Sequence, residues 1–202
     1  MADANVKLCH YKNCGQSQNA IQPTRHHFFG EPAGALHAQL VDGSPPMTAS
    51  NNAAVGSHAD TPVCTASIHA DRPTAPPGRA EVDRTGVASL SCPHGCPIPG
   101  TMVDMARPEH YAVYDAAILQ LLRVDPSMAQ CVVYLDIACR YRPHWRNLVD
   151  KLVSEGHSWV EPSWRDLCIV LPWWHARGHD ETCQVIHSAV YCVSGAALRP
   201  AV

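Results

Sequence analysis

A long stretch of low sequence complexity limits how much of this 202-residue chain can form a packed core. Residues 30 to about 86 consist mainly of Ala, Pro, Ser, Thr, Gly and His, with few aromatic side chains and no sustained helical or alternating apolar period. Ordering the backbone costs roughly 1 to 2 kcal/mol per residue, and this composition offers too little apolar surface to offset that cost. We therefore predict that residues 30–86 are disordered or poorly packed.

The rest of the chain divides into a short N-terminal segment and a longer part with the character of a folded domain. Residues 1–29 are polar and histidine-rich after a short opening segment, whereas residues 87–202 carry Trp, Leu, Val and Cys at the spacing of regular structure. Hydrophobic residues make up 46% of the chain and charged residues 16%, which excludes a chain that is disordered throughout. We predict one domain over residues 87–202.

Apolar patterns in this domain predict a mixed α/β fold. A broad apolar stripe predicts a helix over 108–123, and a compact run with β-branched residues predicts a buried strand over 131–137. A second apolar face predicts a helix over 140–155, in which Pro143 is tolerated only in the first turn. Residues 167–171 indicate a second short strand.

Charge and terminal patterns exclude several classes of protein. The net charge is -3 with 13 histidines counted as neutral, so no global basic field indicates nucleic-acid binding. The sequence has no run of about eighteen apolar residues and no signal-peptide pattern, so we expect no membrane span and a location in the nucleus or cytoplasm. In a reducing compartment the ten cysteines are core residues or metal ligands rather than disulfides. The sequence does not indicate an oligomeric state.

Two local features can be interpreted either as nucleic-acid contacts or as ordinary surface and core residues. Four arginines lie close together, either on a solvated helix face or at a DNA contact: Arg140, Arg142, Arg146 and Arg165. Five tryptophans either fill the core or stack on bases, and in a small α/β domain the core is favoured: Trp145, Trp159, Trp164, Trp173 and Trp174.

Asp136 is the strongest single feature, because it lies in the apolar run Tyr134–Cys139. Burying an unpaired carboxylate is costly, so an acid at the end of a strand usually caps a helix, forms a pair or binds a metal. Capping of the following helix and metal binding both remain open for Asp136. Asp3, at the very start of the chain, is by position alone a residue of a frayed terminus.

Cysteine and histidine side chains cluster at two further places. Cys92, His94 and Cys96 lie together, and the four-residue spacing of His175, His179 and Cys183 places these side chains on one face of a helix. Four of these residues would form a Cys2His2 zinc site: Cys92, His94, His179 and Cys183. The alternative is that these residues bind no metal. A further cluster, Cys9, His10 and Cys14, lacks a matching partner pair.

Several segments resemble, in the same order, the motifs of the Kyakuja-Dileera-Zisupton transposases. The N-terminal matches are to Asp-Ala-Asn-Phe-x-Leu, Cys-x-His-Gly and Gly-x-Val-Asp-Leu: residues 3–8, 92–95 and 100–105. The C-terminal matches are to Glu-Arg-Tyr-x-x-x-Asp, Tyr-Asp-Ile-Ala-Cys and Pro-x-x-His-x-x-x-His: residues 109–115, 135–139 and 171–179. The similarity covers about residues 87–195 together with residues 3–8.

The resemblance implies an RNase H-like domain, a mixed sheet with flanking helices, that acts on DNA. In that family, acidic residues hold two Mg2+ or Mn2+ ions that stabilise the attacking and leaving oxygens of a phosphodiester. On this mapping Asp3 is the first acid and Asp136 the second. The zinc set predicted above also agrees with a zinc-binding feature of the family.

The chain departs from the family pattern at the third acid. The family places Gly-x-Gly-x-x-Asp-Gly-Glu after its His-rich stretch, whereas residues 192–202 contain no carboxylate. Only Met1 and Ala2 precede Asp3, which predicts a first strand too short to hold a ligand rigidly. Residues 9–86 hardly resemble the family, so we expect residues 1–29 to be a remnant of the first strand region and strands of the sheet to be missing.

These observations predict a transposase-derived chain with a truncated RNase H-like core and no DNA cleavage. Two alternatives remain. One is an active nuclease that recruits Asp180 or Glu181 as a third ligand, and the other is a zinc-stabilised protein interaction module without DNA activity.

Overall fold

The computed structural model describes part of the chain, which falls in two units. Unit 1 comprises residues 1–48 and 69–124, and unit 2 comprises residues 49–68 and 125–202. The residues described within them are 2–5, 10–11, 64, 82–84, 86–105 and 110–189. The predicted disorder of residues 30–86 and the cluster around Cys9 and Cys14 therefore lie largely outside the described residues.

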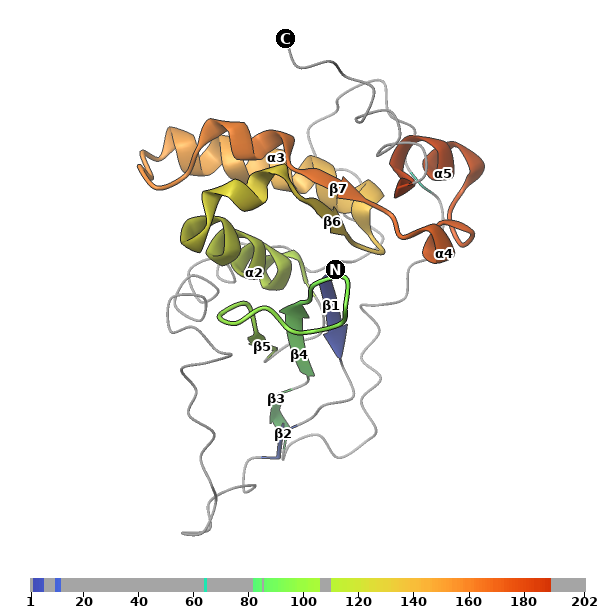
Figure 1. Ribbon diagram of the computed structural model, residues 1–202, viewed down its shortest axis with the longest axis horizontal. Helices are drawn as coiled ribbons and strands as arrows, with labels where there is room; N and C mark the ends of the chain where they lie inside the picture. Colours follow the sequence, from blue (N-terminus) through green and yellow to red (C-terminus); the bar gives the residue numbers. More distant parts are fainter. Residues whose placement is uncertain are drawn as a thin grey trace. The chain divides into compact units, whose positions relative to one another are not determined.

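Unit 1 contains an antiparallel sheet of three strands. The strands β1 (Ala2–Asn5), β4 (Gly86–Leu90) and β5 (Val103–Met105) lie in the order β1-β4-β5 (Figure 1). Asp3 pairs with Ser89 in the register of β1 and β4. The resemblance implied a strand at Asp3, but its pairing with β4 was not expected, because the strands between Asp3 and Cys92 were predicted to be missing. A separate antiparallel pair joins β2 (His10–Tyr11) to β3 (Val82–Arg84).

In the described part of unit 1, one helix packs on this sheet. Helix α2 (Tyr111–Val124) contacts β4 and β5 and buries ten of its residues. The predicted helix over 108–123 is confirmed from residue 111 onward, whereas residues 106–109 lie outside the described part. Alternate residues of β4 are buried, as expected for a strand with one face against a helix.

Unit 2 is built on a parallel pair of short strands. Strand β6 (Val132–Tyr134) pairs with β7 (Cys168–Val170), with Val133 opposite Ile169. The amide of Leu135 continues the ladder by donating to the carbonyl of Val170 at 3.0 Å. Both predicted strands, over 131–137 and 167–171, are therefore present but shorter.

The crossover between these strands contains the longest helix that the structure describes, α3 (Ala138–Ser154), followed by the 3-10 helix η4 (Pro162–Asp166). Trp145 and Trp164 are each 1% exposed, and Nε1 of Trp145 donates to the carbonyl of Trp164 at 2.8 Å. Pro143 lies inside α3, in its second turn, which contradicts the prediction that it belongs to the first turn. The helix begins earlier than predicted. It lacks one backbone hydrogen bond at Pro143, and the packing of its buried face compensates for this loss.

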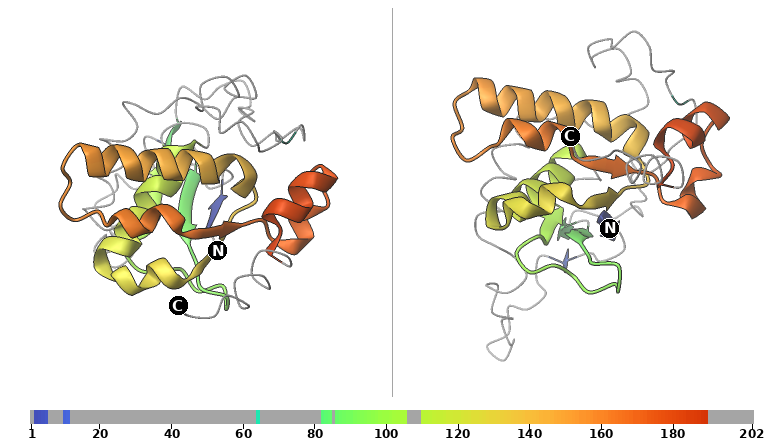
Figure 2. Two further views of the ribbon diagram at one scale, coloured as in Figure 1. Left: turned by 90° about the horizontal axis from the view of Figure 1, so that it is seen from above. Right: turned by 45° about the horizontal axis from the view of Figure 1, so that its top comes forward.

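Unit 2 ends, as far as it is described, in two short helices. Figure 2 shows α4 (Trp173–Ala176) and α5 (Glu181–His187) following β7. The extended chain after α5 returns to the end of β7, because the amide of Leu171 donates to the carbonyl of His187 at 2.7 Å and Ala189 donates to Leu171 at 3.1 Å. These bonds fix α5 beside the end of the parallel pair.

The predicted mixed α/β class is confirmed. The described strands form three separate sheets, so a single RNase H-like sheet remains a prediction. None of the helices in the described part of the chain has both the length and the apolar character that a bilayer crossing needs.

Candidate metal centre

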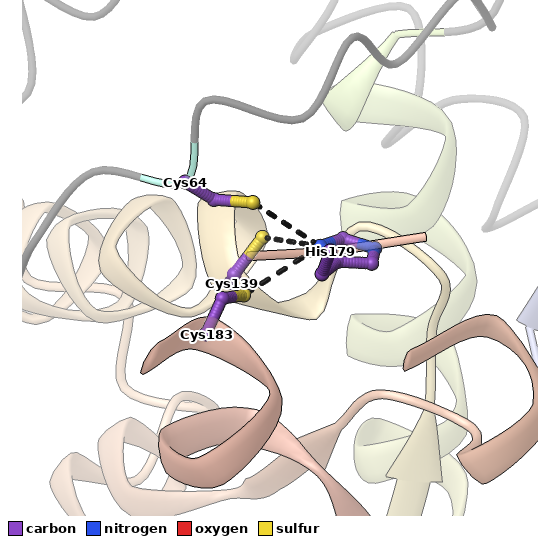
Figure 3. Close-up of side chains that lie close together, drawn as sticks. All are labelled: Cys64, Cys139, His179 and Cys183. Carbon is purple, nitrogen blue, oxygen red and sulfur yellow. Dashed lines mark hydrogen bonds between the residues drawn. The ribbon is translucent and has the colours of Figure 1, made fainter. Parts of the chain in front are cut away.

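Three cysteines and one histidine of unit 2 converge on one point. Their ligand atoms all lie within 4.8 Å of one another (Figure 3): Cys64, Cys139, His179 and Cys183. Cys139 lies in the first turn of α3, His179 in the turn that follows α4, and Cys183 in α5. Cys64, which is 5% exposed, comes from the stretch predicted to be poorly packed.

The spacing of these atoms suits a tetrahedral ion. Nδ1 of His179 lies 3.3 Å from Sγ of Cys64, 3.6 Å from Sγ of Cys139 and 3.5 Å from Sγ of Cys183. Zinc bonds of about 2.3 Å to sulfur and about 2.0 Å to nitrogen place tetrahedral ligand atoms about 3.5 to 3.8 Å apart. The separations between the imidazole nitrogen and the three sulfurs are therefore close to those of a tetrahedral Cys3His site, and all four ligand atoms lie within 4.8 Å of one another.

Local hydrogen bonds hold two of the ligands. His179 and Cys183 are four residues apart around the start of α5, and Nε2 of Gln184 donates to the carbonyl of His179 at 2.7 Å. A guanidinium nitrogen of Arg140 donates to the carbonyl of Cys64 at 3.4 Å. Arg140 therefore connects Cys64 to the helix that carries Cys139.

Burial sets the protonation of the cluster. Loss of solvent raises the pKa of the Cys139 thiol to about 11 and raises the pKa of Cys183 as well, with the neighbouring thiols adding to the effect at Cys183. Burial also lowers the pKa of His179, a shift that a hydrogen bond to the backbone of Asp136 and the charge of Asp136 partly oppose. The imidazole is therefore neutral, the form that binds a metal, whereas the thiols must lose protons to do so.

Of the four predicted zinc ligands, the structure brings together His179 and Cys183. Cys92 and His94 belong to unit 1, where Sγ of Cys92 lies 3.9 Å from Nδ1 of His94 in an exposed turn. Gly95 adopts φ 80° in this turn, and the amide of Cys92 donates to the carbonyl of Cys96 at 2.9 Å. Hydrogen bonds from the Cys96 and His94 backbones lower the pKa of the Cys92 thiol to about 7.

Sequence reasoning missed the other two ligands. Cys139 was noticed only as the last residue of the segment that contains Asp136, although its position three residues after this acid is plain in the sequence. Cys64 had no local signal, because no other cysteine or histidine of a recognisable motif lies beside it.

Comparison with known proteins gives one match. The sequence pattern of a family described as Kyakuja-Dileera-Zisupton transposase matches residues 1–198. The chain belongs to this transposase family. Curated proteins and solved structures gave no significant match. The resemblance stated from the motifs is thereby confirmed, and the match covers nearly the whole chain, including residues 9–86, whose sequence hardly resembles the family motifs.

The two acids that the family pattern implies lie in different units of the transposase chain. Asp136 is half-buried two residues after β6, and Ile137 rather than Asp136 occupies the N-cap position of α3. Asp136 is therefore not the N-cap residue of α3. Asp3 lies in β1, but its side chain is outside the described residues. A Mg2+ or Mn2+ site shared by the two acids is what the resemblance implies, and the expectation that Asp3 is too distant or too mobile to share a cation with Asp136 stays a prediction.

The alternative third ligands lie at the start of α5. Asp180 is the N-cap residue of this helix and Glu181 is exposed in its first turn. Both residues lie between His179 and Cys183 in the sequence. No described carboxylate belongs to the four-residue Cys3His group itself.

The arginine cluster predicted from the sequence makes polar contacts within unit 2. Arg165 lies 3.0 Å from Asp150, Arg146 lies 3.8 Å from Asp166, and Arg142 lies 3.3 Å from Nδ1 of His187, all measured between the polar atoms. These pairs are partly exposed and contribute little stability individually. Together with the bond from Arg140 to the carbonyl of Cys64, they give all four arginines a partner inside the unit.

The tryptophans divide between the two interpretations. Trp145 and Trp164 fill the core as favoured, whereas Trp173 and Trp174 of α4 are 63% and 52% exposed. The prediction that all five fill the core is therefore wrong for α4. Exposure follows from the brevity of this helix, which buries only Ala176.

Proposed function

We propose that this chain is a transposase-derived protein whose second unit is held together by a structural zinc ion, and that the 202-residue polypeptide does not cleave DNA. The observation that carries the proposal is the convergence of three sulfurs on one imidazole nitrogen at 3.3 to 3.6 Å. Family membership supports the transposase origin.

The donor set favours zinc over the ions used for phosphodiester chemistry. Thiolate and imidazole ligands suit zinc, whereas Mg2+ and Mn2+ prefer carboxylate and water oxygens. A catalytic zinc keeps one coordination position open for water, but four protein ligands close the tetrahedron. The buried Cys64 and Cys183, 5% and 4% exposed, further restrict the access of a substrate.

The elements that the ion would join explain why a structural ion is useful here. Helix α4 has 4 residues and α5 has 7, and isolated helices shorter than about 12 residues are marginal in water. A zinc ion would link α5 and the turn before it to α3 and to Cys64. In this way it would replace apolar packing that such short helices cannot supply.

The absence of cleavage is inferred from the acids. Two-metal chemistry needs carboxylates fixed around both ions, and within residues 192–202, where the family places its third acid, no carboxylate occurs. The test is incubation of the purified chain with supercoiled and linear DNA in Mg2+ or Mn2+, beside an Asp136→Ala control. Nicking by the wild type that disappears in this control would contradict the proposal and favour a site completed by Asp180, Glu181 or a second subunit.

Native mass spectrometry tests the zinc proposal. We expect one zinc per chain in the wild type and in Cys96→Ser, whose exposed cysteine lies in unit 1, and a weakened affinity that leaves Cys183→Ser only partly loaded. A wild-type chain that contains no zinc when purified in its presence, or a Cys183→Ser variant that keeps it fully, would contradict the proposal.

A second candidate function is a zinc-stabilised protein interaction module without DNA activity. It is favoured by the net charge of -3 and by the arginines that pair within unit 2. Binding to short duplex DNA at about 50 mM salt separates the two, because nonspecific DNA contacts are strongest at low salt. Binding there favours the transposase-derived function, and its absence favours the interaction module.

A further inference from the structure

The acid Asp136 and the zinc ligand Cys139 share one tight turn. The amide of Ala138 donates to the carbonyl of Leu135 at 3.1 Å, and the amides of Arg140 and Tyr141 both donate to Ile137 at 2.9 Å. Cys139 lies in the helical turn that these bonds close. An ion that fixes the Cys139 sulfur therefore restrains the backbone that leads out of Asp136.

His179 provides a second connection between the ion and Asp136. Its Nδ1 faces the three sulfurs, and its ring also forms a hydrogen bond to the backbone of Asp136. An imidazole has only two nitrogens, so binding of Nδ1 to a metal leaves Nε2–H as the donor of this bond. Metal-bound histidines commonly donate their second N–H to a carbonyl, which fixes the orientation of the ring.

We infer that the Cys3His centre positions Asp136 through His179, which acts as a positioning residue between the zinc ion and the turn that carries the acid. The inference rests on the proposed zinc site and goes beyond it, because a purely structural ion need not control an acid outside its ligand set. Zinc would therefore determine whether the Asp136 carboxylate is held in a fixed place, as any cation bound there requires.

The competing explanation is that the turn is rigid by itself. The backbone bonds around Ile137 and the ladder from Leu135 to Val170 at 3.0 Å already restrain it. The two explanations differ in what happens when the imidazole is removed while the metal stays. Only the positioning role requires the turn to loosen in that case.

Two variants of the full-length chain create this difference. His179→Cys converts the site to four thiolates, which still suit zinc but cannot donate to the carbonyl of Asp136. Cys183→His converts the site to two thiolates and two imidazoles and leaves His179 in place. Replacement of zinc by cobalt reports occupancy in both, because tetrahedral cobalt has a d–d absorption that changes with the number of thiolate ligands.

The measurement is amide hydrogen exchange over residues 136–140, with residues 145–152 of α3 as an internal reference. In zinc-loaded His179→Cys we expect exchange over 136–140 to be about two- to tenfold faster than in wild type, the effect of one hydrogen bond of about 0.5 to 1.5 kcal/mol. Cys183→His should match the wild type. A pH series adds a second readout. The difference in exchange rate over residues 136–140 between His179→Cys and Cys183→His should persist at every pH at which the metal is bound.

The outcomes separate this inference from the zinc proposal. If the wild type binds neither zinc nor cobalt, both fail together. If wild type and His179→Cys both bind metal and exchange over 136–140 is unchanged, the zinc site stands and the positioning role is refuted. If His179→Cys does not load, the wild type still decides: a slowly exchanging Nε2–H of His179 with a through-bond NMR correlation to the Asp136 carbonyl supports the inference, and its absence overturns it.

Discussion

Zinc affinity should depend steeply on pH, since the proposed ligands must release protons to bind. Burial raises the pKa of Cys139 to about 11 and raises that of Cys183, so both thiols are protonated near neutral pH. The lowered pKa of His179 leaves its imidazole neutral there, and it contributes no proton. Zinc binding therefore releases at least the two protons of Cys139 and Cys183.

The magnitude follows from the proton count. Two released protons raise the apparent zinc association constant about 100-fold per pH unit, or about 2.7 kcal/mol of binding free energy. In Cys183→Ser one of these protons is no longer released. The zinc association constant should therefore rise by only about tenfold per pH unit, and the affinity itself should be lower. Cys96→Ser, in unit 1, should leave both the affinity and its pH dependence unchanged.

A competition titration against a chromophoric chelator at about pH 6.5, 7.0 and 7.5 measures this slope. Calorimetry in two buffers of different ionisation enthalpy gives the proton count independently. A slope below about tenfold per pH unit for the wild type would refute the reasoning, because it would mean that the ion is not bound by these buried thiols. An unchanged slope in Cys183→Ser would refute it equally.

Three further outcomes follow from single side chains of unit 2. Burial and the Arg142 guanidinium lower the pKa of His187 to about 4, so the unfolded chain binds this proton first and the free energy of unfolding should fall by about 2 to 3 kcal/mol between about pH 6.5 and pH 4. Urea unfolding of wild type and His187→Gln checks this, and equal pH profiles would contradict it. Trp145→Phe should cost about 1 to 3 kcal/mol in the same assay, because it removes the 2.8 Å bond to Trp164 and leaves a gap in the core; a cost near zero would show that the bond is dispensable. Trp173→Ser should change the free energy of unfolding by less than about 0.5 kcal/mol, since this side chain is 63% exposed, and a larger loss would reveal an unexpected packing role.

The elements that the sequence predicted best are those with local apolar patterns. The run around Val133 and the face of α3 led to β6, β7 and the crossover helix, because burial imposes these patterns within a few residues. The start of α3 was misplaced because the proline rule was weighed more heavily than packing. Buried Tyr141 and Trp145 hold the helix on both sides of Pro143.

Long-range pairings were beyond local reasoning. The pairing of Asp3 with Ser89 joins segments separated by most of unit 1, and nothing in either short strand specifies its partner. The same limit applies to the metal centre. The spacing of His179 and Cys183 along one helix end was visible, whereas the approach of Cys64 to these residues depends on a chain path that no motif records.

A last comparison separates the two contributions of Asp136, its carboxylate and its backbone. The bond to the His179 ring is made by the backbone of Asp136, which a side-chain substitution retains. We therefore expect Asp136→Ala to keep one zinc per chain and to change the free energy of unfolding by less than about 1 kcal/mol, as is usual for a half-buried residue outside the core. Cys139→Ser, three residues away, should lose the ion and destabilise unit 2, because a ligand and a cross-link of short helices are removed together. Native mass spectrometry and urea unfolding of both variants measure the contrast. Zinc loss in Asp136→Ala would mean that the carboxylate itself stabilises the bound ion. Asp136 would then hold the zinc ion in place, instead of being positioned by it.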